Sequence, residues 1–283
     1  MQNTTNSILK KLISEIQSPC LKEKYKSSES DFTRKRKQEF SLTLLFLMNF
    51  LKKSLSIEIE NFVKMINSQL KHKVLKIFTK SAFVQCRKKI QPDVFSHLSS
   101  VLLTEFYANR TNVKLWNGFR LLSVDGSRLT LPNTEELREI YGEAKNSDKQ
   151  GTAQGRLSVL YDVLNGYVID GILSPLSLGE VVLAGKHLSH VEKGDLVIYD
   201  RGYPSFDLVY RHKKLEVEFL MRVKTSFSKM TQSFFESNKK SAVVEMFPGK
   251  NTKFSDKEYD KKTSVKVRLL RIELSSGETE ILI

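Results

Sequence analysis

The chain has 283 residues, of which 40% are hydrophobic and 28% charged, a composition typical of a globular protein. Two cysteines, Cys20 and Cys86, form no Cys-x2-Cys pair, which argues against a disulfide framework and a zinc site. The longest apolar run, residues 40–51, is too short and too interrupted to span a bilayer, and the first twenty residues lack a signal-peptide core. These features predict a cytoplasmic protein without a membrane partner.

The net charge of +14 is concentrated in one part of the chain. Residues 1–120 contain 22 Lys and Arg against 9 Asp and Glu, whereas residues 121–283 contain 24 against 23. A one-sided cationic excess attracts a polyanion, most often nucleic acid, and an anionic membrane surface is the alternative.

The first 115 residues predict helices. Apolar residues recur at helical spacing between Ile8 and Ile16, and Ser18-Pro19 marks a stop. Two further helices are expected at about residues 40–52 and around residues 59–66. The loop before the first of these carries four consecutive basic residues, Arg34, Lys35, Arg36 and Lys37, which are expected to bind DNA.

A possible recognition helix, "SAFVQCRKKI", spans residues 81–90. Its apolar residues share one face, and its polar and basic residues point elsewhere. Lysine can neutralise phosphate and glutamine can contact a base edge, so DNA binding is expected from Gln85, Arg87, Lys88 and Lys89. A solvated helix face is the simpler alternative, and the regional charge favours DNA.

From about residue 118 the apolar period changes from 3.6 to 2, which indicates strands. We expect a strand ending at Asp125, a Gly-Ser turn after it, and a hairpin with a type I′ turn at Asn165-Gly166. A capping box at 177–180 should open a helix to about His190. A strand at 195–200, a helix capped by Ser205 and a strand at 217–223 follow. Beyond residue 227 we expect polar loops and a hairpin over 264–283. This order predicts a mixed α/β layer.

Two carboxylates occupy matching positions in this pattern. Asp125 follows an apolar run at 121–124, and Asp200 follows another at 196–199. If the two strands are neighbours, both carboxylates emerge at the same end of the sheet, where open α/β sheets bind ligands. Carboxylates paired in this way can hold Mg²⁺ and support phosphodiester chemistry.

Each polar motif also has an alternative interpretation, in which its residues have a structural role only. Asp-Gly and Asp-Arg-Gly are frequent turn formers. Asp162 and Asp170 flank the predicted hairpin and are expected to be turn or surface acids. His187 and His190 form a His-x2-His pair, and His187 is expected to be packed in the core.

Four stretches together resemble bacterial insertion-sequence transposases of the Asp-Asp-Glu class. They are "DFTRKRKQEFSLTLLFLMNFLKKSL" (31–55), "SVDGSRLTLP" (123–132), "YDVLNG" (161–166) and "GDLVIYDRGYPSF" (194–206). The similar branch has Asp-x-Gly-Tyr/Phe as its second motif and Tyr-x2-Arg-x3-Glu-x6-Lys as its third. The resemblance covers the chain from about residue 31 onward.

The resemblance implies a ribonuclease-H-like mixed sheet behind a helical DNA-binding region. It divides the chain into a basic DNA-binding region (1–117), the first part of the catalytic core (118–226) and a β-rich insertion (227–283). Asp125 and Asp200 take the first two metal-ligand positions, with Mg²⁺ or Mn²⁺ as cofactor. Arg201 is expected either to contact phosphate or to form a structural ion pair. The implied partners are transposon-end and target DNA and a second copy of the chain on DNA, in the bacterial cytoplasm at the nucleoid.

The third motif is missing from the sequence. No Tyr-x2-Arg-x3-Glu-x6-Lys occurs, and the chain stops at Ile283 within an apolar strand. We therefore expect an incomplete core from a C-terminally truncated transposase with little strand transfer. The alternatives are a non-catalytic fragment that occupies transposon ends and inhibits the full-length enzyme, or a product without a selected role.

Overall fold

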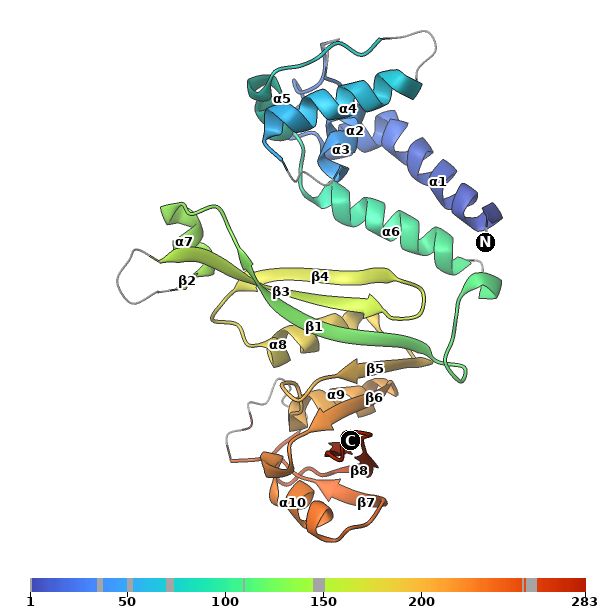
Figure 1. The fold of residues 1–283 in the computed structure, drawn as a ribbon, viewed down its shortest axis with the longest axis vertical. Helices are drawn as coiled ribbons and strands as arrows, with labels where there is room; N and C mark the ends of the chain where they lie inside the picture. The colour runs from blue at the N-terminus through green and yellow to red at the C-terminus, as the bar shows by residue number, and fades with distance from the viewer. Residues whose placement is uncertain are drawn as a thin grey trace. The chain divides into compact units, whose positions relative to one another are not determined.

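In the computed structural model, residues 2–34, 38–49, 53–69, 74–108, 110–144, 151–250, 252 and 259–283 are described. They form two units, Met1–Val113 and Lys114–Ile283 (Figure 1). Within the described ranges, no helix is both long enough and apolar enough to cross a membrane. Each unit has hydrophobic cores of its own and is described by itself.

The first unit is helical. Its helices are α1 (Gln2–Gln17), α2 (Pro19–Tyr25), α3 (Phe40–Met48), α4 (Leu55–Gln69), α5 (Lys80–Arg87) and α6 (Asp93–Ala108), followed by a 3₁₀ turn (Arg110–Asn112). Ser18 ends α1 and also begins α2, because its hydroxyl accepts a hydrogen bond from the Cys20 amide at 3.2 Å and Pro19 occupies the first turn. The helices predicted near residues 8–16, 40–52 and 59–66 are confirmed.

Helix α3 is the centre of this unit. Phe40 and Leu44 pack into one apolar cluster with α2 and α6, whereas Phe46 packs into a second cluster with α4 and α5. The Phe46 ring meets the rings of Phe62 and Phe83 edge-on, at centroid distances of 5.0 and 4.7 Å. A helix that feeds two cores must be apolar on most sides, which accounts for its nearly unbroken hydrophobic sequence.

The second unit is a mixed sheet with helices. Its strands are β1 (Arg120–Thr130), β2 (Glu143–Ala144), β3 (Thr152–Asp162), β4 (Tyr167–Pro175), β5 (Asp195–Tyr199), β6 (Glu218–Val223), β7 (Ser241–Met246), β8 (Val265–Glu273) and β9 (Thr279–Leu282). The helices are α7 (Glu135–Tyr141), α8 (Glu180–His187), α9 (Phe206–Leu215) and α10 (Lys229–Glu236), with 3₁₀ turns at Leu188–His190 and Thr225–Phe227. The strand order is β2-β3-β1-β5-β6-β9-β8-β7, and β4 also pairs with β3. The pairs β1–β5 and β5–β6 are parallel and the others antiparallel, so the predicted mixed α/β class is confirmed.

The turn predicted after Asp125 is wrong. Strand β1 continues without interruption from Arg120 to Thr130, and Gly126 lies opposite Ser158 in its antiparallel pairing with β3. The extended partner strand keeps the Asp-Gly dipeptide straight, since the ladder satisfies the backbone groups that a turn would otherwise use. Asp125 therefore lies within a strand, not at its end.

The hairpin between β3 and β4 is confirmed, but its turn is not the predicted two-residue type. The strands end at Asp162 and begin again at Tyr167, and within this loop only Gly166, with φ of 78°, is left-handed. The buried Asp162 carboxylate accepts hydrogen bonds from the amides of Leu164 and Asn165 at 3.2 and 3.0 Å. This aspartate shapes the longer loop, in agreement with its expected turn role.

The predicted capping box is also wrong. Helix α8 begins after Gly179, which makes no side-chain cap, and the Glu180 side chain pairs with Arg156 of β3. The capping box is not formed because Glu180 is the first residue of the helix and not its third.

Asp170, expected as a turn or surface acid, binds the buried His187 at 2.7 Å (Oδ2 to Nδ1). The other ring nitrogen of His187 lies 2.9 Å from Ser158 Oγ. His187 is thus packed in the core, as the sequence predicts.

The segment after residue 227 extends the main sheet. Helix α10 and strand β7 occur where the sequence predicted polar loops, whereas the β8–β9 hairpin is confirmed. Strand β9 pairs with β6, and Met221 and Ile283 exchange backbone hydrogen bonds of 2.9 Å in both directions. Apolar residues of β6, β8 and β9 thereby share one core with β1 and β5.

A buried polar pair joins β5 to α9. The Tyr199 hydroxyl lies 2.8 Å from Nε2 of His212, and His212 Nδ1 lies 3.3 Å from the Val217 carbonyl. Since Nδ1–H donates to that carbonyl, Nε2 accepts from the tyrosine. Both residues are buried, and burial lowers the pKa of His212 to about 4.

We expect acid to destabilise the protein through His212. Because its pKa in the folded state lies below the ordinary 6.5, the unfolded chain takes up the proton first. Stability therefore falls as pH drops from about 6.5 toward about 4, by about 3 kcal/mol in the limit. Urea unfolding at pH 7 and pH 4.5 measures this loss. The His212→Gln variant keeps an acceptor for Tyr199 without titrating, so an equal pH dependence in this variant would contradict the assignment.

Candidate functional site

Asp125 and Asp200 occupy equivalent positions on adjacent parallel strands. The β1–β5 pairing runs from Arg120 opposite Asp195 to Ser123 opposite Ile198, with partners 75 positions apart (195 − 120). Asp125 and Asp200 are also 75 apart (200 − 125), and each follows this paired segment by two residues. Strand alternation places Asp125 on the face of Ser123, opposite the buried face, whereas Asp200 is the first residue after β5.

The strands separate at this point. Beyond Asp125, β1 continues along β3, whereas β5 ends at Tyr199 and the chain turns, with the Tyr203 amide donating to the Asp200 carbonyl at 3.2 Å. Both aspartate side chains are exposed. The Asp125 carboxylate accepts from the Gly126 amide at 2.8 Å, and Asp200 Oδ1 lies 3.5 Å from Arg222 Nη1.

Tyr203 lies behind the two aspartates. Its side chain is buried, and its hydroxyl has no hydrogen-bond partner among the residues that the structure describes. Burial, together with the nearby negative charges of Glu180, Asp125 and Asp200, raises the pKa of Tyr203 to about 12. The hydroxyl thus lies within electrostatic reach of three carboxylates and stays protonated at neutral pH.

Gly126 leaves room between this tyrosine and the strand. A Cβ at Gly126 would lie 3.4 Å from Glu180 Cγ and 3.5 Å from the Tyr203 hydroxyl oxygen. These are ordinary contact distances, so an added Cβ would touch Glu180 and Tyr203 without displacing them. The glycine after Asp125 lies close to both residues and makes no turn.

A second ionic group adjoins Asp200. Glu280 of β9 has a 6% exposed side chain and pairs with both Arg201 and Arg222, the latter at 2.6 Å (Oε1 to Nη2). These guanidinium groups, Arg222 first, lower the pKa of Glu280. Arg201, expected either at phosphate or in an ion pair, forms the ion pair. Tyr203 belongs to the Asp-x-Gly-Tyr motif of the sequence, which gave it no role, whereas no local pattern connects Arg222 and Glu280 to Asp200.

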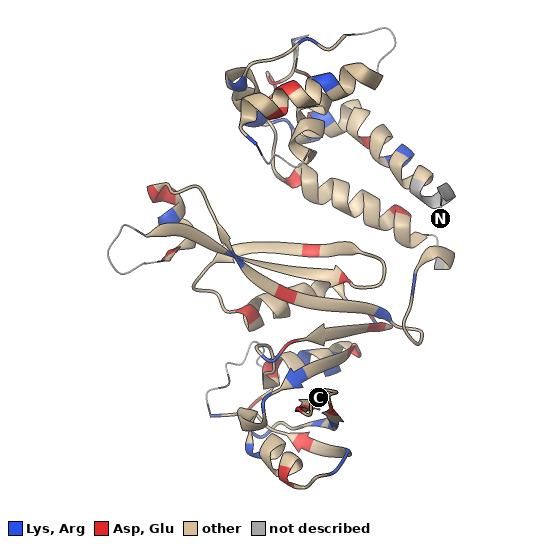
Figure 2. Cartoon of the chain, viewed as in Figure 1, with Lys and Arg blue, Asp and Glu red and all other residues tan. Residues whose placement is uncertain are grey.

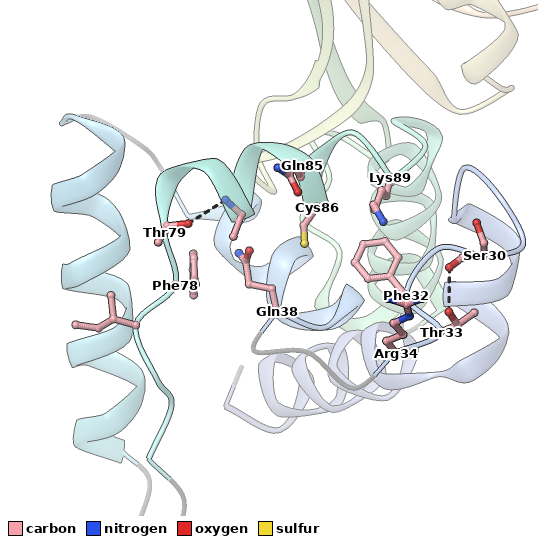
Figure 3. A pocket seen from close by; sticks show the side chains of 12 residues that line it. Ser30, Phe32, Thr33, Arg34, Gln38, Phe78, Thr79, Gln85, Cys86 and Lys89 are labelled. Carbon is pink, nitrogen blue, oxygen red and sulfur yellow. Dashed lines mark hydrogen bonds between the residues drawn. The ribbon is translucent and has the colours of Figure 1, made fainter.

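The predicted DNA-binding residues of the first unit fall into two groups. Arg34, Gln85 and Lys89 line one cavity of about 780 Å³, between α5 and the segment before α3 (Figure 3). Arg87 and Lys88 are exposed at the end of α5, outside that lining. The predictions for Lys35, Arg36 and Lys37 lie outside the described residues. Figure 2 shows basic residues on α1, α4 and α5.

The chemistry of Asp125 and Asp200 fits a hard divalent cation. Carboxylate oxygens are the ligands that Mg²⁺ and Mn²⁺ prefer, and Mg²⁺ commonly uses one or two carboxylates together with substrate phosphates. Within the described ranges, no group of three or more His, Cys, Asp and Glu residues is arranged to hold a metal ion. The two aspartates can therefore provide part of a coordination shell that other oxygens complete.

Sequence comparison identifies the family. Residues 116–274 match the transposase DDE domain, and the chain belongs to this family, whose members generally use divalent metal ions. Both aspartates lie within the matched segment.

A relative is "Putative transposase InsZ" of Escherichia coli (strain K12), 26% identical over 137 residues, which are 48% of this chain and 46% of the relative. The chain thus spans about half the length of the curated relative that it matches.

Two solved structures overlap with the chain at low similarity. One is a piggyBac transposase synaptic complex with hairpin DNA, at 12% identity and a TM-score of 0.36, covering 96% of this chain and 49% of the other. The second is the Mos1 transposase paired-end complex with the left transposon end, at 10% identity and a TM-score of 0.24, covering 68% and 61%. These scores are too low to define a shared fold, so the family assignment rests on sequence.

Two neighbouring tyrosines give opposite expectations for stability. Tyr203→Phe removes a buried hydroxyl without a partner among the described residues, so we expect it to stabilise the protein by about 1 kcal/mol. Tyr199→Phe removes the hydrogen-bond partner of His212, so we expect it to destabilise the protein by about 1–3 kcal/mol. Urea unfolding at pH 7 measures both. Equal destabilisation by the two variants would mean that the Tyr203 hydroxyl is hydrogen-bonded.

Proposed function

We propose that this chain binds transposon-end DNA and that its second unit carries part of the metal site for strand cleavage and transfer. The observation that supports the proposal is the register of β1 and β5, because Asp125 and Asp200 each follow the paired segment by two residues where the strands separate. Both acids lie in the segment that matches the transposase DDE domain. Target DNA is the second proposed partner, and a homodimer on DNA at the nucleoid is the proposed assembly.

The strand order supports a ribonuclease-H-like core for the second unit. Strands β4, β3 and β1 are antiparallel neighbours, and β5 and β6 continue the sheet parallel to β1, with α8 and α9 as the connecting helices. In this arrangement the first strand and the first strand after the crossover each contribute one acid. Residues 227–283 would then be the β-rich insertion, which here extends the same sheet through β9.

In this proposal each residue near the two acids has a role in binding DNA or the cation. Asp125 and Asp200 bind a Mg²⁺ or Mn²⁺ ion, which supplies Lewis-acid stabilisation of phosphodiester cleavage. Gly126 allows close packing beneath the site, and Tyr203 excludes water from its inner side. Arg222, which lies near Asp200 and is held by Glu280, is the proposed contact for a DNA phosphate.

A non-catalytic role is the second candidate for this chain. Within the described ranges, no third acidic ligand accompanies the two aspartates, and loss of a metal ligand removes most catalysis. The excess of basic residues in positions 1–120 would still support DNA binding. The chain would then occupy transposon ends and inhibit a full-length enzyme, with little or no strand transfer of its own.

Paired substitution of the two aspartates tests the metal site without relying on activity. In EDTA, Asp125→Asn with Asp200→Asn should bind duplex DNA more tightly than the wild type, because two carboxylates that repel phosphate are neutralised. With Mg²⁺ the wild type should recover most of this difference, since the cation masks the same charges. Anisotropy titrations of a labelled duplex measure both conditions. A difference that Mg²⁺ leaves unchanged would count against cation binding at these aspartates.

Salt dependence tests DNA binding by the basic unit. The purified chain should bind duplex DNA with an affinity that falls steeply as salt rises. Arg87→Ala with Lys88→Ala should lower the salt slope by about 2, if each contacts one phosphate. Lys64→Ala, which removes a lysine paired with Glu60 on α4, is the control.

Incubation of the same complex with Mg²⁺ or Mn²⁺ separates the two candidate functions. Binding without cut strands favours the inhibitor, whereas cleavage that Asp200→Ala abolishes favours the enzyme. Failure of the chain to bind DNA even at low salt would contradict both candidate functions.

A further inference from the structure

The cavity in the first unit contains a glutamine whose amide is unsatisfied. Gln38 is 5% exposed, and neither Nε2 nor Oε1 has a hydrogen-bond partner among the described residues. A buried amide without partners costs free energy, so such a group is retained only where something else compensates. Gln38 lines the cavity, and Figure 3 shows its side chain pointing into the space between Phe78 and Phe32.

An amide of this kind recognises a base edge. It presents a donor and an acceptor side by side, and glutamine typically pairs in this bidentate way with N6 and N7 of adenine. Other bases also offer an adjacent donor and acceptor, so the amide is able to pair with a nucleobase, and adenine is the base that glutamine most often contacts in this way. Saturation of both orphan atoms by one ligand would remove the cost of burying them.

The rest of the lining suits a nucleotide. Phe32 provides an aromatic surface for stacking, since base–aromatic stacking is a common contact for unpaired bases. Arg34 supplies positive charge for a phosphate. Lys89 also lines the cavity, and its ammonium group is paired with the Asp31 carboxylate at 3.0 Å, which orients it and offsets its charge. A volume of about 780 Å³ is within the range of roughly 300–1,000 Å³ of small-molecule sites.

The depth of the amide excludes a base that remains in the helix stack. A side chain that is 5% exposed cannot reach the edge of a base in the groove of an intact duplex, so the base must leave the stack and enter the cavity. We propose that the cavity bounded by Gln38, Phe32, Arg34 and Lys89 binds a nucleotide with an unstacked base. The ligand is either an unpaired nucleotide of DNA or a free mononucleotide. The DNA source rests on the proposed function above.

Two labelled duplexes of the same mixed sequence test the DNA source with the full 283-residue chain. One duplex is perfectly paired and the other carries a single unpaired adenine. Fluorescence anisotropy should show at least about tenfold tighter binding of the second duplex. Gln38→Leu should reduce this ratio to about one while leaving the affinity for the paired duplex unchanged.

Two further variants control for folding and for nonspecific loss of an amide. Gln38→Leu should melt at a higher temperature than the wild type, because it removes a buried amide without described partners. A lost preference therefore cannot be ascribed to unfolding. Gln38→Glu keeps the size but lacks the amide donors and should weaken the adenine preference, too. Gln69→Leu, an exposed glutamine at the end of α4 outside the cavity lining, should leave the ratio unchanged.

Calorimetry with AMP tests the free-nucleotide source. Suppose that AMP binds, that Gln38→Leu abolishes this binding, and that the duplex with the unpaired adenine is not preferred. The cavity would then be a nucleotide site, but its ligand would not come from DNA. Equal affinity for the two duplexes and no binding of AMP would overturn the cavity proposal alone. Failure to bind even the paired duplex at low salt would overturn the proposed function. The AMP titration would then show by itself whether the cavity binds a nucleotide.

Discussion

The parallel pairing of β1 with β5 is the constraint on which the candidate site depends. These strands are distant in the sequence, and in their register Asp125 and Asp200 each follow the paired segment by two residues. The apolar residues on the other face, among them Leu122 and Val197, are fully buried and hold that register in place. A slip of one residue would turn one aspartate into the core, where burial of a charge is costly.

The strands next to this pair have different roles, since β3 holds β1 straight and β9 contributes a charged residue. Antiparallel pairing with β3 keeps β1 straight beyond Asp125, whereas β5 turns away and leaves the two carboxylates at an open edge. On the other side, β9 brings a nearly buried glutamate, Glu280, against two arginines. This anion offsets their charge and fixes Arg222 near Asp200, so an arginine can stay beside an acidic site without neutralising it completely.

Unsatisfied polar groups mark both units. The hydroxyl of Tyr203 beneath the aspartates and the amide of Gln38 in the helical unit are each buried without a partner among the described residues. Most buried polar groups in folded proteins are hydrogen-bonded, and exceptions concentrate where a ligand or a chemical step uses them. The two groups differ in their surroundings, since Tyr203 lies among carboxylates and Gln38 shares its cavity with Arg34 and with Lys89, which is paired with Asp31.

The sequence by itself determined the periodic elements, the two acids and the family resemblance. Helical spacing around Ile8–Ile16 and the alternation in β3 and β4 could be recognised because such patterns are local. The family followed from motifs that include Asp125 and Asp200, and the match over residues 116–274 agrees with it. Only tertiary structure decided that Asp125-Gly126 stays extended, because its turn tendency yields to pairing with β3. It likewise paired Glu280 with Arg201 and placed Arg34 in the lining of the same cavity as Gln85 and Lys89, which no local pattern encodes.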